Sequence, residues 1–169
     1  TLLSGAALRY HPFAIDCFQQ AIRLTQQVGD KRAEGIHLGN LATIYKKIGQ
    51  YEKGAEIYKQ AVQIASEIND KRSTGIHLGN LGNLYYFLDK FDEAMGFLTQ
   101  GVEIAQELGN KRAEAIHLGN LGIVLGAVER WDEGQAYLLS SIELCKTVFP
   151  TAAGAFAAYL AVILAQQSK

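Results

Sequence analysis

A block of about forty residues occurs three times in this chain. The segment Ile-His-Leu-Gly-Asn-Leu is identical at residues 36–41, 76–81 and 116–121. A fixed period between 20 and 50 residues marks a chain built from stacked structural repeats. Each repeat contacts mainly its neighbours, and the stack offers an extended surface to other macromolecules. The repeat therefore favours a binding protein, and we expect no enzymatic activity.

Composition adds limits on the partners. Hydrophobic residues make up 49% of the 169 residues, which is enough for a continuous core, and the formal net charge is −1. A near-neutral chain has no general basic field for nucleic acid. No signal peptide is visible, and the longest apolar run, residues 152–165, is shorter than the roughly 20 residues of a membrane span. We expect a cytoplasmic protein without nucleic-acid or membrane partners.

The two cysteines fit the same picture. Cys17 and Cys145 stand at repeat positions that other repeats fill with apolar residues, so we expect core residues rather than a disulfide. The chain begins without methionine and with an incomplete repeat. We therefore expect a fragment of a longer protein, and an engineered array stays open.

Each repeat is predicted to form two helices joined by a short turn. In the second repeat, these helices cover about residues 71–88 and 91–108. Apolar residues of the second helix recur at helical steps of three and four, at Phe91, Ala94, Leu98, Val102 and Ala105. The connecting Asp89-Lys90 is so short that the helices must pack antiparallel, as a hairpin.

Helix-ending and helix-starting residues recur in phase with this pattern. Residues that tolerate the left-handed conformation of a helix end stand at Gly29, Asn69 and Gly109. Each is followed by a good N-cap residue, namely Asp30, Asp70 and Asn110.

The repeat resembles the tetratricopeptide repeat. The second copy carries the resemblance in Leu78, Leu81-Gly82, Tyr85, Phe91, Ala94, Leu98 and Gly101. The longer period and the missing boundary proline are typical of the long-repeat subclass, which is similar to kinesin light chains, Leu-Gly-Asn repeat proteins and sensor arms of bacterial signalling ATPases. The resemblance implies an all-α fold of antiparallel helical hairpins stacked into a right-handed superhelix.

The predicted organisation is one solenoid. Full repeats are expected at residues 29–68, 69–108 and 109–148. Residues 1–28 match the second helix of an incomplete repeat, and residues 149–169 are expected to form a capping or interface helix.

In this family the first helices line the concave groove, which implies a set of partner-binding residues. They are Arg32, Asn40, Thr43, Lys47, Arg72, Asn80, Asn83, Phe87, Arg112, Asn120 and Ile123. An asparagine amide can pair with any peptide backbone, although a structural ladder of asparagines between repeats is the alternative. The adjacent glycines are costly inside a helix, so either a ligand backbone or a neighbouring helix must need their clearance.

Charge suggests the chemistry of the partner. The first-helix segments carry a net positive charge and the second-helix segments a net negative charge. A basic groove favours an acidic peptide. The alternative is that Arg32, Arg72 and Arg112 pair with carboxylates of the chain, such as Glu34 or an acid of the next repeat.

Histidine recurs once in each repeat, at His37, His77 and His117. Adjacent helices pack about 8–10 Å apart, whereas zinc needs nitrogen ligands near 2.0–2.1 Å. We therefore expect these rings to pack between successive first helices and predict no metal. No phosphate-binding loop or catalytic constellation is visible, and no cofactor is expected.

The last helix, about residues 152–166, is apolar on more than one face and carries no charge. A helix that is apolar all round is normally buried, so we expect self-association through it, with a tolerable alanine-rich cap as the alternative. The leading function is a module that binds a peptide, and the alternative is a sensor or self-assembly arm of a larger signalling protein.

Overall fold

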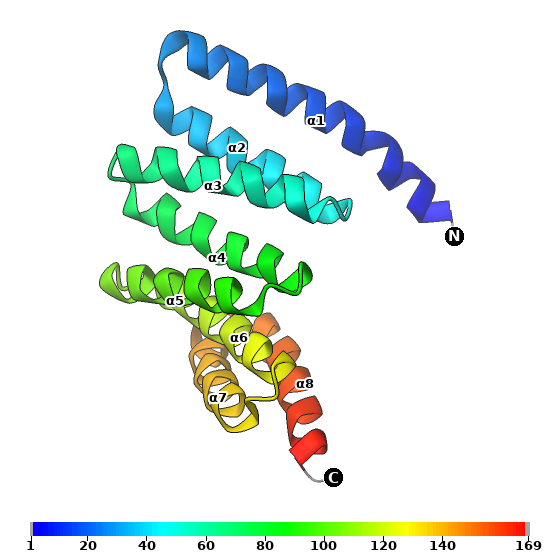
Figure 1. Ribbon diagram of the computed structural model, residues 1–169, viewed down its shortest axis with the longest axis vertical. Helices are drawn as coiled ribbons and strands as arrows, with labels where there is room; N and C mark the ends of the chain where they lie inside the picture. The colour runs from blue at the N-terminus through cyan, green and yellow to red at the C-terminus, as the bar shows by residue number, and fades with distance from the viewer. Residues whose placement is uncertain (1, 168–169) are drawn as a thin grey trace. The chain divides into compact units, whose positions relative to one another are not determined.

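The structure, a computed structural model, describes the backbone of residues 2–167 and the side chains of residues 11–167. This part of the chain is helical, with short turns and no strand (Figure 1). The helices are α1 (Leu2–Val28), α2 (Lys31–Lys47), α3 (Tyr51–Glu67), α4 (Lys71–Phe87), α5 (Phe91–Glu107), α6 (Lys111–Ala127), α7 (Trp131–Val148) and α8 (Pro150–Gln167). The predicted all-α fold of tandem helical hairpins is confirmed.

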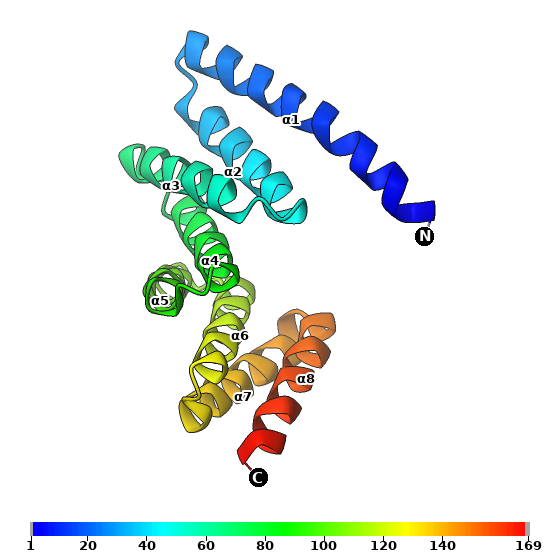
Figure 2. The ribbon, with the colours of Figure 1, turned by 45° about the vertical axis from the view of Figure 1, so that its right-hand side comes forward.

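The chain divides into two compact units within α4, between His77 and Leu78. In the first unit, α2 packs against both α1 and α3. In the second unit, α6 packs against α5 and α7, and α8 lies against α7 and part of α6 (Figure 2). None of the described helices combines the length and hydrophobicity needed to cross a bilayer.

The predicted signals at helix ends are present in the structure. Gly29 and Gly109 end their helices with φ of +74° and +63°, and Asn69 adopts the same left-handed conformation at +56°. The following Asp30 accepts a hydrogen bond from the backbone N–H of Ala33 at 2.9 Å. Asn110 caps α6 in the same way. Local sequence thus fixes where each first helix begins.

Inside each hairpin, a first helix meets a second helix at a small residue. A Cβ atom added at Gly82 would lie 2.7 Å from Leu98, and one at Gly122 would lie 2.8 Å from Leu138. A hydrogen bond also joins the second of these pairs, α6 and α7. The Ser141 hydroxyl donates to the carbonyl of Ala115 at 2.6 Å. Gly82 and Gly122 are therefore packing glycines of the hairpin.

Successive first helices meet through a ring that lies on a glycine. The His77 imidazole covers Gly39 in the first unit, and the His117 imidazole covers Gly79 in the second. In both places an added Cβ would overlap the ring, so only glycine fits. Phe156 of α8 covers Gly119 in the same way. The prediction that the histidines pack between first helices is confirmed for His77 and His117, whereas His37 lies beside Phe18 of α1, with ring centroids 6.1 Å apart.

One expectation for the cysteines is wrong. Cys145 is buried in the core of the second unit, but Cys17 is exposed on α1. Cys17 stands one period before the partly buried Ile57. It is exposed because the described chain places no first helix in front of α1, which packs against α2 alone.

Burial controls the charge of the ring at Gly79. The pKa of His117 is lowered by desolvation from 6.5 to about 4, and burial also lowers the pKa of His77. Neither ring has a hydrogen-bond partner for its nitrogens within the described residues. Both are therefore neutral near pH 7 and serve as flat apolar wedges.

We expect His117 to make the protein sensitive to acid. The unfolded chain takes up a proton near pH 6.5 while the folded chain resists until about pH 4, so stability is complete above pH 6.5 and falls as pH drops between these values. Between pH 7.5 and pH 5 this amounts to about 2 kcal/mol. The His117→Phe variant, which copies the ring that Phe156 provides at Gly119, should lose less stability over this interval. Urea unfolding at both pH values tests this, and an equal loss in both proteins would contradict it.

Candidate functional site

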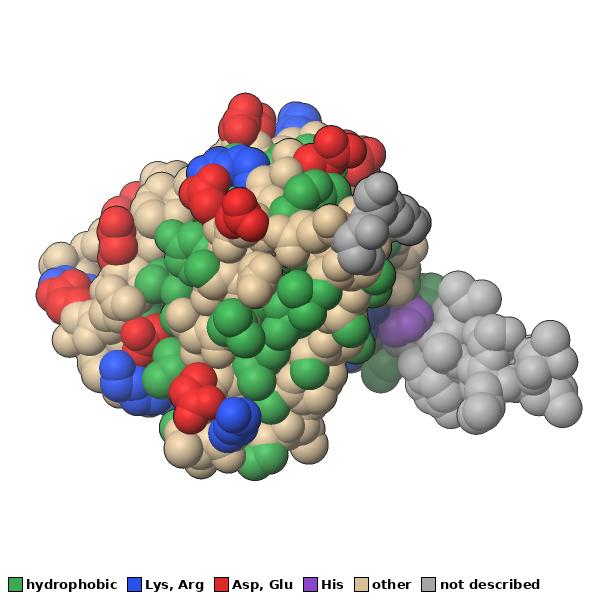
Figure 3. Space-filling view, turned by 90° about the horizontal axis from the view of Figure 1, so that it is seen from below, with side chains coloured by type: hydrophobic (Ala, Val, Ile, Leu, Met, Phe, Trp, Pro, Cys, Tyr) green, Lys and Arg blue, Asp and Glu red, His purple; other side chains and the backbone are tan. Residues whose placement is uncertain are grey.

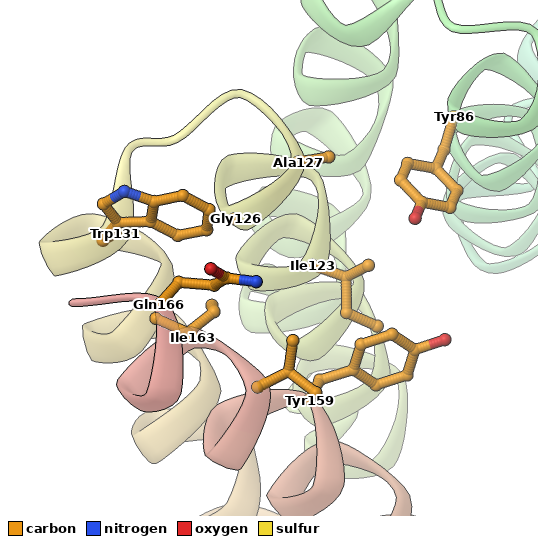
Figure 4. A pocket seen from close by; sticks show the side chains of 9 residues that line it. Tyr86, Ile123, Gly126, Ala127, Trp131, Tyr159, Ile163 and Gln166 are labelled. Carbon is orange, nitrogen blue, oxygen red and sulfur yellow. The ribbon is translucent and has the colours of Figure 1, made fainter. Parts of the chain in front are cut away.

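The second unit contains an open apolar groove between α4, α6 and α8. Its volume is about 220 Å³, and it is lined by Tyr86, Ile123, Gly126, Ala127, Trp131, Tyr159, Val162, Ile163 and Gln166. Figure 4 shows Tyr86 and Tyr159 on opposite sides of Ile123, with Trp131 and Gln166 at the other end. No lining residue is charged, so the groove suits an uncharged, apolar group.

The two tyrosines make the groove amphipathic. Burial raises the pKa of Tyr86, and the neighbouring Tyr159 raises it further. The Tyr86 phenol is consequently neutral near pH 7, and a tyrosine hydroxyl can donate or accept a hydrogen bond beside an apolar wall. Phe87 packs edge-on against Tyr86 with ring centroids 5.5 Å apart. The aromatic side chains thus support one another around the opening.

Of the residues predicted to bind a partner, Ile123 lies directly in the groove wall. Asn120 precedes it by three residues on α6, at the spacing that keeps side chains on one helix face. Asn83 and Phe87 on α4 stand one period before Ile123 and Ala127, which line the groove. Among the predicted partner-binding residues, Ile123 is thus the one that lines this groove, and the partner-binding role of the whole set stays a prediction.

The asparagines do not form a structural ladder. Within the described part of the chain, the side chains of Asn40, Asn80 and Asn120 make no hydrogen bond to protein, and none of the three is buried. Their glycine neighbours, by contrast, are covered by aromatic rings of the next first helix. The space beside each glycine thus accommodates a side chain of a neighbouring helix, and the asparagine amides remain available for a partner.

The arginines divide into two groups. The Arg32 guanidinium lies 3.7 Å from the carboxylate of Asp70, an acid of the next repeat. The Arg112 guanidinium lies 4.1 Å above the ring of Phe149. Arg72 is exposed and has no such contact within the described residues, as is also true of Lys47. The predicted basic face is therefore partly engaged by the chain itself.

Asp70 shows why its pairing with Arg32 is secondary. The pKa of Asp70 is lowered mainly by the hydrogen bond from the backbone N–H of Ser73, and Arg32 contributes less. The Asp70 carboxylate therefore acts mainly as the N-cap of α4, and its attraction to the Arg32 guanidinium is the weaker interaction. Because the Arg32 side chain is 76% exposed, this ion pair contributes little to stability.

Thr43 has a structural contact as well. Its hydroxyl donates to the carbonyl of Gly39 at 2.9 Å and lies 2.7 Å from the hydroxyl of Tyr58. The phenol of Tyr58 is buried, and this hydrogen bond satisfies it. Thr43 thus links α2 to α3, whatever else it contacts.

Sequence reasoning missed most of the groove wall. Tyr86 lies outside the predicted set although it stands beside Phe87, and the residues of α8 are predicted to form a capping or interface helix, with no part in the groove. Tyr159 in fact occupies the position on α8 that Asn120 occupies on α6, one residue short of the forty-residue period. The signal was the break at Phe149-Pro150, where α7 gains a residue and the turn loses two. When the period between α6 and α8 is shortened by one residue, Tyr159 and Val162 correspond to Asn120 and Ile123 of α6. Both residues of α8 line the groove.

The structure offers no site for a metal among its described residues, where no group of three histidine, cysteine, aspartate or glutamate side chains comes together. His77 and His117 instead pack separately, one on Gly39 and the other on Gly79.

Comparison with known proteins identifies the repeat. A family model described as tetratricopeptide repeat matches residues 8–67 and 34–107, which together make up more than half of the chain. No curated protein sequence matches the chain.

Solved structures share the fold at low sequence identity. BtubC (BKLC) from P. vanneervenii is 18% identical with a TM-score of 0.71, covering 94% of this chain and 80% of that one. A putative kinesin light chain with nearly identical repeats from Podospora anserina is 16% identical with a TM-score of 0.75, covering 97% and 84%. A signal transduction ATPase with a tetratricopeptide repeat sensor from Pyrococcus horikoshii is 20% identical with a TM-score of 0.77, and 88% of this chain covers only 23% of that protein.

Proposed function

The chain belongs to the tetratricopeptide repeat family, and we propose that it is an interaction module that binds a protein partner through a peptide segment along its first helices. The observation that carries this proposal is the combination found in the second unit. Asn80 and Asn120 have no protein partner among the described residues, and Asn120 lies one helical turn before Ile123, which lines an uncharged aromatic groove. Such a surface can bind a peptide backbone through amides and one apolar side chain through the groove.

The partner that we propose is an acidic segment with an aromatic or branched aliphatic anchor. In the first unit, Arg72 and Lys47 are exposed and can attract carboxylates. In the second unit, the uncharged groove accepts the anchor. A cytoplasmic location belongs to the same proposal and is supported by the free thiols of Cys17 and Cys145, since disulfides are rare in reducing compartments.

A self-assembly role is the second candidate. It is favoured by exposed apolar residues of α8, among them Leu164, which is 45% exposed.

Peptide display against the whole chain gives the partner sequence needed for testing. We expect the selected peptides to share an apolar anchor flanked by acidic residues. Selected peptides without a common apolar position would contradict the groove as the anchor site.

Val162→Asp should weaken binding of a selected peptide by roughly 10- to 100-fold, because burying an aliphatic or aromatic side chain is worth about 1.5–3 kcal/mol. Val162 is 58% exposed in the groove, so folding should be retained. The matched control is Leu139→Asp, since Leu139 is 49% exposed on α7 and lies outside the groove. Fluorescence polarisation measures both, and equal affinity in the two variants would exclude the groove.

Asn80→Ala should weaken the same peptide about three- to tenfold, the scale of one hydrogen bond, while stability changes by less than about 0.5 kcal/mol. The stability should hold because the amide has no protein partner within the described residues. Thermal unfolding and peptide titration on one sample decide the matter. A stability loss above about 1 kcal/mol with unchanged affinity would make the asparagine structural.

Arg72→Ala should weaken an acidic peptide and flatten the salt dependence of its binding, because the exposed guanidinium interacts over the 8–10 Å screening length of physiological salt. Arg112→Ala is the matched comparison, since its guanidinium lies on Phe149 and should contribute less. Titrations at low and high salt measure both slopes. A wild-type affinity that does not change with salt would remove the electrostatic part of the proposal.

A further inference from the structure

Three asparagine side chains of the second unit have unused hydrogen-bonding capacity. Asn80 and Asn83 on α4 and Asn120 on α6 make no hydrogen bond within the described residues. An amide both donates and accepts, so it pairs best with a partner whose own backbone groups are free. The backbone groups of an α-helix are already paired within the helix, whereas those of an extended segment are free. An extended segment therefore fits these side chains better than a helix does.

The first helices of the second unit follow one another through the same kind of contact. His117 of α6 lies on Gly79 of α4, and Phe156 of α8 lies on Gly119 of α6. Helices in contact are about 8–10 Å apart. A segment that crosses α4, α6 and α8 therefore meets equivalent positions of these helices at about that interval.

Two rows of equivalent side chains follow this interval. One row consists of Asn80, Asn120 and Tyr159, and the other of Asn83, Ile123 and Val162. The second row changes from an amide on α4 to apolar side chains on α6 and α8, and Ile123 and Val162 line the groove. A segment in register with this row places an apolar side chain over Ile123 and Val162, and the side chain one interval away over Asn83.

The interval selects one extended conformation. In a β-strand, side chains return to the same face every second residue, which is about every 6.6 Å, and then at about 13 Å. In a polyproline II helix, side chains return to the same face every third residue, which is about every 9.3 Å. Only the second spacing matches the distance of about 8–10 Å between neighbouring helices. A polyproline II segment can thus repeat one contact on successive first helices.

The charge of the surroundings suits such a segment. No residue that lines the groove is charged, and α8 carries no charge from Pro150 to Gln167. Figure 3 views the molecule from the α7 and α8 end and shows hydrophobic side chains gathered on that surface, with charged ones towards its edges. The backbone of a polyproline II helix offers unpaired but uncharged polar groups, for which amides and tyrosine hydroxyls are suitable partners. Uncharged residues of the segment therefore match α6 and α8 best.

Given the peptide binding proposed above, on which this step rests, we propose that the partner segment crosses α4, α6 and α8 as a polyproline II helix, three residues for each first helix. Its apolar anchor lies over Ile123 and Val162. A hydrogen-bonding side chain three residues from the anchor pairs with the Asn83 amide. The two residues between these contacts face away from the protein, so proline is accepted there.

A double-mutant cycle locates the residue that pairs with Asn83. The probe is a fluorescein-labelled peptide selected by display against the whole chain, with alanine placed in turn at the positions two, three and four residues from its anchor. The effect of Asn83→Ala on affinity should depend on the residue three positions from the anchor, with a coupling of about three- to tenfold, the scale of one hydrogen bond. Asn83 is half-buried and makes no hydrogen bond within the described residues, so this variant should fold normally.

Asn40→Ala is the matched control, because Asn40 lies in the first unit and should show no coupling with the same peptide residue. Coupling of Asn83 at two or four residues from the anchor, positions that share a face in a β-strand, would overturn the polyproline II conformation. Absence of coupling at every position would overturn the pairing with Asn83. Failure of the proposed function itself has a different signature, since Val162→Asp then leaves the affinity of the selected peptide unchanged, and both proposals fall.

Proline substitution in the peptide tests the conformation directly. Proline fixes φ at about −65°, close to the polyproline II value, and directs the preceding residue towards the same region. Proline at one or both of the positions between the two contacts should leave affinity unchanged or raise it about two- to fivefold, because the free peptide has less freedom to lose. The same change would disrupt a segment that binds as an α-helix. Glycine at these positions is the control and should weaken binding. Weaker binding with proline than with glycine at both positions would overturn the proposal.

Discussion

The contact between an aromatic ring and a helix glycine determines how first helices stack. A glycine inside a helix costs roughly 0.8–1.0 kcal/mol relative to alanine, yet Gly39, Gly79 and Gly119 all lie within helices. Each cost is offset by the ring that fills the space of a missing Cβ. Phe156 replaces histidine at the last glycine, so the contact depends on a flat ring and not on imidazole chemistry. Burial then holds His77 and His117 neutral, as a wedge between helices must be.

The three residues of the repeated Leu-Gly-Asn tripeptide have different roles with respect to this contact. Leu38 is buried in the hairpin core and Gly39 receives the ring, whereas Asn40 is exposed. The leucine and the glycine are explained by packing alone. The asparagine has no such explanation, because it makes no hydrogen bond within the described chain. A residue that recurs in three repeats without a structural contact is the part of the tripeptide that function must explain.

The sequence allowed prediction of the helices and hairpins because the signals were local and recurrent. Caps such as Asp30 and left-handed residues such as Gly29 act within one turn of the chain, and they agree with the apolar period. The groove was harder to predict, since Tyr86 and Tyr159 are far apart in sequence and meet only after α8 shifts by one residue. The contacts of the arginines were hard to predict for another reason. Arg112 is held by an aromatic ring at a junction where the repeat pattern breaks, and position in the repeat does not reveal such a contact.

Helix α8 can serve both proposed roles because it has three separate faces. Phe156 and Ile163 point into the core of the second unit, where both are buried. Tyr159 and Val162 line the groove, and Ala161 with Leu164 are exposed on a third face of the helix. At 3.6 residues per turn these pairs lie on different sides of the helix, so a partner peptide and a second copy need not compete.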